Sequence, residues 1–263
     1  MATAKKPIGT EEENVEVPQK KTDLELLNDD KEYYNGVGKN YLSNSDIGVL
    51  LSNPKEFGNP REDNKNFAEG RYFHQLLIEK DKAKFVDSVD VSTRTTKEYK
   101  AYCETHNIAF AMLTKEKEEV ERLVKIMTAN IQFYDDIYAD GNQFEVPAIT
   151  EMFGMKWKGK ADIVGDNFII DLKTTSDIQK FKWSAKAYNY DSQAFIYQTL
   201  FDKPLVFYVI DKVTGQLGIF RPTEEFIRGG ELKVQKAVEI FNRYFGQAPS
   251  DDIDNYYIDE MLY

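Results

Sequence analysis

The stretch that decides the fold is residues 158–173, Lys-Gly-Lys-Ala-Asp-Ile-Val-Gly-Asp-Asn-Phe-Ile-Ile-Asp-Leu-Lys. Its two short apolar runs, separated by turn-forming residues, predict a β-hairpin. The first strand is expected from Lys160 to Val164 and the second from Phe168 to Leu172. Gly165-Asp166-Asn167 forms the tight turn between them.

Three charged residues interrupt this otherwise apolar hairpin. Asp162 lies on the first strand, and Asp171 and Lys173 lie at the end of the second. Asp171 and Lys173 are two residues apart, so their side chains point to the same face of the strand. Two carboxylates beside a lysine can hold a divalent cation and activate a water, so the hairpin predicts metal-dependent hydrolysis. The alternative is an exposed ion pair on the strand, which would add little stability.

The composition is that of a folded protein. With 263 residues and 41% hydrophobic content, the chain fits one large domain or two small ones with a sizeable core. Its one cysteine excludes a disulfide framework and agrees with a reducing cytoplasm. No apolar run reaches the roughly 18 residues of a membrane span, so no membrane association is expected. Residues 1–10 lack the apolar segment of a signal peptide.

The net charge of −11 argues against nucleic-acid binding until its distribution is considered. Most of the excess acid lies in residues 1–40 and 246–263. Residues 156–186 instead carry seven lysines against four aspartates. The overall acidity therefore leaves room for a locally basic groove.

The chain divides into three regions. Residues 1–40 are polar and charged without an apolar period, and we expect them to form a disordered arm. Residues 41–245 are expected to be one domain, helical over 41–140 and built of a sheet with helices over 141–245. Residues 246–263 form an acidic, tyrosine-rich tail that is either disordered or docked on another subunit.

Within the domain, periodicity predicts helices followed by the order β-β-β-α-β-β-α. The early helices are expected to follow Ser43 and to cover 67–79, 97–105 and 114–132. The later elements are expected to be strands 143–153, 155–164 and 168–173, a helix over 183–201, a hairpin of 205–210 with 217–220, and a closing helix over 227–245.

Two other patterns have open interpretations. His74 shares a helix face with Gly70 and Leu77, so it is either a satisfied core residue or a metal ligand that needs a partner site. The second pattern is a set of lysines interleaved with aromatic residues: Lys180, Lys182 and Lys186 with Phe181, Trp183 and Tyr188. These lysines form either a solvated helix face or an edge that contacts phosphates.

Together these residues resemble a known family. Asp162, followed by Asp171-Leu172-Lys173, resembles the PD-(D/E)XK nuclease signature in its Asp-X-Lys form, a short and weakly specific motif. The Gln193-x-x-x-Tyr197 element and His74 in a Gly-x-x-x-His helix match the RecB-like branch. The segment 42–57 is similar to the opening helix of phage and prophage exodeoxyribonuclease VIII-like (RecE-type) exonucleases. The match covers roughly residues 41–245 in order, with Ala161 in place of the proline that gives the motif its name.

The resemblance implies an α/β (α+β) fold, with a restriction-endonuclease-like core whose central mixed β-sheet is flanked by helices and preceded by a helical extension. It also implies roles for individual residues. The metal ligands would be His74, Asp162, Asp171, the Leu172 backbone carbonyl and Glu145. Lys173 would be the catalytic lysine beside Asp162 and Asp171, and Gln193 and Tyr197 would orient it or touch the DNA backbone. The DNA-contacting residues would be Lys160, Thr174, Thr175, Lys180, Lys182 and Lys186.

The resemblance further implies a Mg²⁺- or Mn²⁺-dependent exonuclease, with one or two ions per site, that acts on double-stranded DNA ends. Such an enzyme would be phage- or prophage-encoded, act in the bacterial cytoplasm, form a homo-oligomer, and supply single-stranded tails to an annealing recombinase. The alternatives are a structure-specific or nicking endonuclease on the same fold, or a catalytically inactive DNA-binding module. The intact set of Asp162, Asp171 and Lys173 argues against the inactive module.

Overall fold

A mixed β-sheet forms the centre of the protein. The computed structural model describes residues 21–60 and 62–259. Within them, the main sheet has five strands in the order β3-β4-β5-β6-β7. The strands β3, β4 and β5 pair antiparallel, β5 and β6 pair parallel, and β6 and β7 pair antiparallel. Their bounds are Gln143–Met152, Met155–Val164, Ile169–Thr175, Leu205–Asp211 and Leu217–Phe220. The predicted α/β fold with a central mixed sheet is therefore confirmed.

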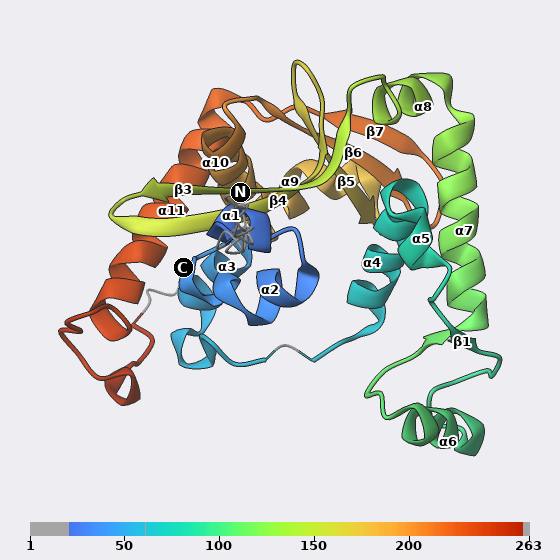
Figure 1. The fold of residues 1–263 in the computed structure, drawn as a ribbon, viewed down its shortest axis with the longest axis horizontal. Helices are drawn as coiled ribbons and strands as arrows, with labels where there is room; N and C mark the ends of the chain where they lie inside the picture. Colours follow the sequence, from blue (N-terminus) through green and yellow to red (C-terminus); the bar gives the residue numbers. More distant parts are fainter. Residues whose placement is uncertain (1–20, 61, 260–263) are drawn as a thin grey trace, which may run out of the picture.

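Helices cover both faces of this sheet, as Figure 1 shows. On one face, Ile170 and Leu172 pack with buried residues of α4 (Lys65–Ile78), α7 (Thr114–Ala129) and α8 (Ile131–Ile137). On the other face, Ile169 and Phe207 pack with residues of α9 (Phe181–Ala187), α10 (Tyr190–Phe201) and α11 (Glu224–Tyr244). Because β5 is buried on both faces over its first four residues, Asp171 lies inside the protein, and Lys173 follows at the partly buried end of the strand.

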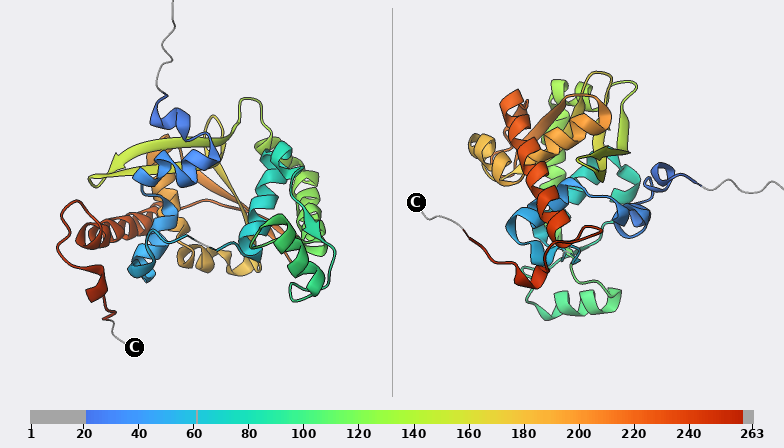
Figure 2. Two further views of the ribbon diagram at one scale, coloured as in Figure 1. Left: turned by 60° about the horizontal axis from the view of Figure 1, so that its bottom comes forward. Right: turned by 90° about the vertical axis from the view of Figure 1, so that its left-hand side faces the viewer.

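Two smaller units flank this core. Helix α3 (Asn44–Ser52) packs with α10 and α11 in a third apolar cluster that includes Trp157 at the start of β4. Helix α6 (Lys97–His106) stands off the rest of the chain in the right-hand view of Figure 2, next to the short parallel pair β1 (Ser88–Val89) and β2 (Met112–Leu113). The short helix α5 (Lys80–Ala83) follows α4 directly.

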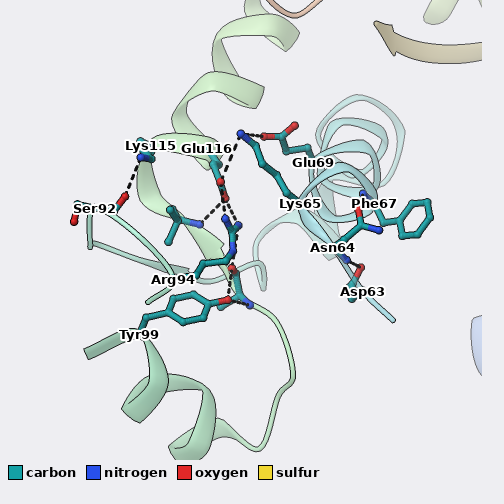
Figure 3. A network of polar contacts seen from close by, with 12 residues as sticks. Asp63, Asn64, Lys65, Phe67, Glu69, Ser92, Arg94, Tyr99, Lys115 and Glu116 are labelled. Atoms are coloured by element: carbon teal, nitrogen blue, oxygen red, sulfur yellow. Dashed lines mark hydrogen bonds and ion pairs between the residues drawn. The ribbon is translucent and has the colours of Figure 1, made fainter. Parts of the chain in front are cut away.

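A buried carboxylate holds the α6 unit against α4 and α7. Figure 3 shows Arg94 and Lys65 converging on Glu116 at the first turn of α7. Arg94 Nη1 donates to Glu116 Oε1 at 2.9 Å, and the Leu113 N–H donates to Oε2 at 3.0 Å. Tyr99 of α6 donates to the Ala111 carbonyl at 3.1 Å. The contacts from Arg94, Lys65 and the Leu113 N–H satisfy Glu116, whose burial without partners would be unfavourable.

The predicted disordered arm over residues 1–40 is wrong for residues 21–40, which fold onto the domain. They form α1 (Asp23–Leu26), α2 (Asp30–Asn35) and a 3-10 turn at Val37–Asn40. Side-chain caps start both helices, and the apolar residues Leu27 and Tyr33 become buried, which offsets the entropy lost on ordering. The rest of the predicted arm, residues 1–20, lies outside the described residues.

Two further differences from the expected elements concern the C-terminal half. The single helix expected over 183–201 is broken into α9 and α10, because Asn189 adopts a left-handed backbone with φ of 58°. In the acidic tail, Arg243 binds Asp251 at 2.7 Å and Lys55 donates to the Asp254 carbonyl at 3.1 Å, so this part lies against its own chain. The proposed domain boundaries stay a prediction.

No helix within the described residues is both long enough and apolar enough to cross a membrane.

The close crossing of α10 and α11 gives a test of the fold. A Cβ at Gly230 would lie 2.0 Å from the Asp191 carbonyl oxygen, whereas the nearest atom to a Cβ at Gly229 is 3.9 Å away. We expect Gly230→Ala to lower the free energy of unfolding by about 1–3 kcal/mol through this backbone clash. Its neighbour Gly229→Ala should raise the same quantity by about 0.5–1 kcal/mol through helix propensity. Urea denaturation measures both, and effects of the same sign would contradict the packing described here.

Candidate active site

The sheet opens between β4 and β5, and this opening creates the site. Among the described residues, the two strands pair only at Ile163↔Ile170 and Val164↔Ile169. Beyond these pairs, side chains replace the missing strand partner. The Leu172 N–H donates to Asp162 Oδ2 at 2.7 Å, and the Leu172 carbonyl accepts a hydrogen bond from His74 Nε2 at 2.8 Å. We call the opening bounded by His74, Asp162 and Leu172 the β4–β5 fork.

Three side chains from three elements meet at this fork in an arrangement that could hold a metal ion. One ligand atom from each of His74, Glu145 and Asp162 lies within 4.8 Å of the other two. His74 comes from α4, Glu145 from β3 and Asp162 from β4. His74 Nδ1 also lies 3.4 Å from Asp162 Oδ1. The structure thus brings together three of the predicted ligands, and the Leu172 carbonyl adjoins them through His74.

Glu145 reaches the cluster through an unusual backbone conformation. It has a φ of 51°, a left-handed value that is strained for a residue with a β-carbon. The ladder between β3 and β4 pairs Phe144 with Ile163 and Val146 with Ala161, and it skips the pair between them, Glu145 and Asp162. The two carboxylates therefore lie opposite one another where the ladder is interrupted. Strain of this kind is typical of functional positions.

Asp171 and Lys173 form the second part of the site. Asp171 is 2% exposed and its Oδ1 accepts a hydrogen bond from Gln193 Nε2 at 2.6 Å. Its Oδ2 lies 2.7 Å from the Lys173 ammonium but has no hydrogen bond of directional geometry. The Lys173 Nζ lies 4.9 Å from the ring centre of Tyr190, which adds a cation–π contact.

The crowding of acids shifts several pKa values. Burial, reinforced by the Asp162 charge, raises the pKa of Glu145 to about 8. Burial likewise raises the pKa of Asp171, against the effect of Lys173. For His74, burial opposes the charged form, but the adjacent Asp162 raises its pKa to about 9. Burial acts against the Asp162 carboxylate too, yet the neighbouring His74 holds its pKa below the usual value. Three acids close together in a poorly solvated place favour a cation.

The residues present fit a divalent cation. Carboxylate and carbonyl oxygens are the ligands that Mg²⁺ and Mn²⁺ prefer, and one imidazole is compatible with Mn²⁺. Around an octahedral ion with bonds of about 2.1 Å, ligand atoms lie about 3–4 Å apart. The separations of up to 4.8 Å in the cluster are slightly larger, so a small side-chain adjustment suffices. The buried and incompletely bonded Asp171 Oδ2 is a further acceptor turned toward a positive charge.

Two predicted residues act differently from the expectation that they orient Lys173 or touch DNA. Gln193 binds Asp171 and not Lys173. Tyr197 donates its hydroxyl to the Lys160 carbonyl at 3.0 Å, and its ring lies against Gly159, where a Cβ would meet it at 3.1 Å. Tyr197 therefore positions the backbone of β4, and Gln193 positions a carboxylate.

The predicted DNA-contacting residues also divide into groups. Lys160 is already paired within the protein. Its Nζ lies 2.7 Å from Asp30 of α2 and 4.6 Å from the centre of the Tyr33 ring, and its side chain is 8% exposed. Thr174 and Thr175 are half-buried at the end of β5. The exposed members are Lys180, Lys182 and Lys186.

Sequence reasoning missed two contributors to the site. Tyr190 has no predicted role, although its position three residues before Gln193 places both on one helix face. Asp30 and Tyr33, which contact Lys160, lie in residues 21–40, for which the composition predicts disorder. The pair Tyr33-Tyr34, within an otherwise polar stretch, was the available signal that this segment packs.

The chain is similar to a known protein family and to solved structures. The model of the family described as "PDDEXK-like domain of unknown function (DUF3799)" matches residues 50–213, a range that contains the whole β4–β5 fork. The crystal structure of a "Putative exonuclease" from Eubacterium rectale is similar over 89% of this chain and 96% of that chain, with 18% sequence identity and a TM-score of 0.60. The crystal structure of SSO0001 aligns over 62% of this chain and 84% of that chain, with 16% identity and a TM-score of 0.28. No curated protein matches the chain.

Metal binding at the fork can be tested without a substrate. We expect Mn²⁺ or Mg²⁺ to raise the thermal unfolding midpoint by several degrees, since a ligand at a hundredfold excess over its dissociation constant adds about 2.7 kcal/mol. Asp162→Asn and Glu145→Gln should greatly reduce this shift, and chelation should reverse it. Glu151→Gln, which changes an exposed carboxylate on the same strand as Glu145, is the matched control. Equal metal-induced shifts in all four proteins would place the ion elsewhere.

Proposed function

This chain belongs to the family of PDDEXK-like domains, and on that premise we propose that it is a nuclease that hydrolyses phosphodiester bonds in DNA with the aid of a divalent cation. The observation that carries the proposal is the position of Lys173. Its ammonium lies beside Asp171, and its charge acts on both His74 and Asp162 of the cluster. A cation site with a lysine at its edge is suited to phosphoryl chemistry.

Each residue of the site then has a role. His74, Glu145, Asp162, Asp171 and the Leu172 carbonyl would hold the ion. When bound, the ion supplies positive charge to the scissile phosphate and lowers the pKa of a coordinated water.

The groups around the ion position the reactants. Lys173 carries its proton on Nζ, where Asp171 and the Tyr190 ring fix it, so it donates a hydrogen bond to the attacking water or to a phosphate oxygen. Gln193 keeps the Asp171 carboxylate in place through its bond to Oδ1. Because these groups are held before the substrate arrives, little reorganisation is needed during the reaction.

The DNA backbone would run along the end of β5 and over α9. The hydroxyls of Thr174 and Thr175 follow Lys173 directly, and Lys180, Lys182 and Lys186 extend the positive charge onto α9. Lys160 can join them only if a phosphate replaces Asp30 as its partner. Such a local basic strip would allow a chain whose net charge is −11 to bind DNA.

We propose more specifically an exonuclease that acts on double-stranded ends, encoded by a phage or prophage and active in the cytoplasm of a bacterial host. The support for this finer assignment is the resemblance of the opening helix to exodeoxyribonuclease VIII-like proteins, together with the Gln-x-x-x-Tyr element that matches the RecB-like branch. The same resemblance suggests a homo-oligomer that provides single-stranded tails to an annealing recombinase. An endonuclease on the same fold is the second candidate, since the proposed chemistry at the site does not depend on a DNA end.

The decisive experiment compares DNA forms in the presence of Mg²⁺ or Mn²⁺. We expect linear duplexes to be degraded and closed circles to survive, with the reaction stopped by chelation. Lys173→Ala should lower the rate at least about 100-fold, because it removes a preorganised donor at the reacting phosphate. Lys100→Ala, which alters an exposed lysine on α6, should leave the rate unchanged. Cleavage of closed circles would favour the endonuclease, and binding without cleavage in all proteins would contradict the nuclease.

A further inference from the structure

Two large aromatic side chains are exposed on the segment that follows the catalytic strand. Trp183 of α9 is 63% exposed and Tyr188, in the turn after α9, is 67% exposed. The apolar residues Phe181 and Ala185 of the same helix are buried in the core, so α9 has its own packed face and does not need these two rings for stability. Exposed aromatic rings that the core does not use are available for contact with a ligand.

The turn that carries Tyr188 is rigid. Asn189 has a φ of 58°, and its carbonyl accepts hydrogen bonds from Asn44 of α3 at 3.2 Å and from the Ser192 hydroxyl at 2.9 Å. Lys233 of α11 donates to Asn189 Oδ1 at 2.9 Å and to the Lys186 carbonyl at 2.6 Å. Asparagine tolerates this left-handed backbone, and helices on two sides hold the turn in one conformation. The position of Tyr188 is therefore fixed by these contacts.

The turn connects the exposed rings to the active site. The Tyr188 ring centre lies 5.9 Å from that of Tyr190, and the Tyr190 ring lies 4.9 Å from Lys173 Nζ. The left-handed Asn189 between the two tyrosines leaves Tyr188 exposed, while Tyr190 contacts the catalytic lysine. A strand whose phosphate lies at Lys173 would thus meet aromatic rings next to the reacting bond.

The charges around these rings fit a polyanion. Lys182 Nζ lies 4.2 Å from the centre of the Trp183 ring. Lys180 pairs with Asp177, but among the described residues neither Lys182 nor Lys186 forms an ion pair. Exposed rings beside lysines without an ion pair are an arrangement by which proteins bind single strands, since each base offers a flat face for stacking and each phosphate a negative charge. In a duplex these faces are stacked inside and unavailable.

From these contacts we infer that Trp183, Tyr188, Lys182 and Lys186 form a stacking platform for single-stranded DNA, which receives the unpaired strand next to the scissile phosphate. The inference rests on the proposed nuclease function and extends it: the strand enters the site with its bases unpaired. A duplex end is then a substrate only once it has frayed. Deletion of a ring should affect flush ends and frayed ends differently.

Binding can be measured apart from cleavage, in EDTA, where the metal is removed. The chain has two tryptophans, and Trp157 is fully buried, so a change in exposed tryptophan emission reports Trp183. Oligo(dT) should quench this emission, and an abasic oligodeoxynucleotide of equal length should quench it far less. Trp183→Ala and Tyr188→Ala should each weaken oligo(dT) binding about tenfold in fluorescence anisotropy, and Trp183→Phe should retain most of the affinity. Tyr257→Ala, which removes a tyrosine that is 75% exposed on the C-terminal segment, is the matched control.

Cleavage provides the second measurement. The wild-type protein should cleave a forked duplex faster than a flush one, and Trp183→Ala should lose most of that preference while keeping its fold and metal-induced thermal shift. Equal affinity for oligo(dT) and the abasic strand, or unchanged binding in Trp183→Ala, would overturn the platform even if the protein degrades DNA. Absence of cleavage from every DNA, with oligo(dT) binding that depends on Trp183, would overturn the nuclease proposal and keep the platform.

Discussion

The site depends on how one peptide group, that of Leu172, is satisfied. Strand β5 pairs with β6 along its length but with β4 over only two residues, so the Leu172 N–H and carbonyl lose their strand partner. Buried backbone groups must be hydrogen-bonded. Here the Leu172 N–H donates to Asp162, and the Leu172 carbonyl accepts from His74. Folding of the sheet thereby orients two of the proposed ligands before any ion binds. A cation bound between His74 and the Leu172 carbonyl would replace their hydrogen bond with two ligand bonds.

The arrangement is unfavourable without a compensating charge, which is why it indicates function. Glu145 is held at a strained backbone angle opposite Asp162, and Asp171 is almost fully buried with one oxygen poorly bonded. Neither feature helps the core to pack. The arrangement is instead suited to a cation, with Lys173 fixed at its edge. Strain and clustered acids at the same position in the fold are more informative than either feature alone.

Much of this architecture could be predicted because it depends on local patterns. The order of elements along the chain, the hairpin and the helices around Ser43 and His74 follow from periodicity and turn chemistry, and the Asp-X-Lys motif placed the candidate site on β4 and β5. The roles of Gln193 and Tyr197 could not be read from spacing, which places them on one face of α10 but does not say which atoms they reach. The prediction of disorder for residues 21–40 was wrong because only a few apolar residues, such as Leu27 and Tyr33, anchor this segment. The average composition of the segment is polar and does not reveal these anchors. The left-handed backbone at Asn189 depends on Asn44 and Lys233, which lie far away in sequence.

The central claim is that the β4–β5 fork holds the catalytic cation. Anomalous diffraction from a crystal of the protein soaked in Mn²⁺ tests it most directly. We expect a peak within about 2.5 Å of carboxylate oxygens of Glu145, Asp162 and Asp171, the Leu172 carbonyl and a ring nitrogen of His74. The peak should disappear in Asp162→Asn. A Mn²⁺ peak bound elsewhere, with the hydrogen bond between His74 and Leu172 intact and the fork unchanged, would contradict it.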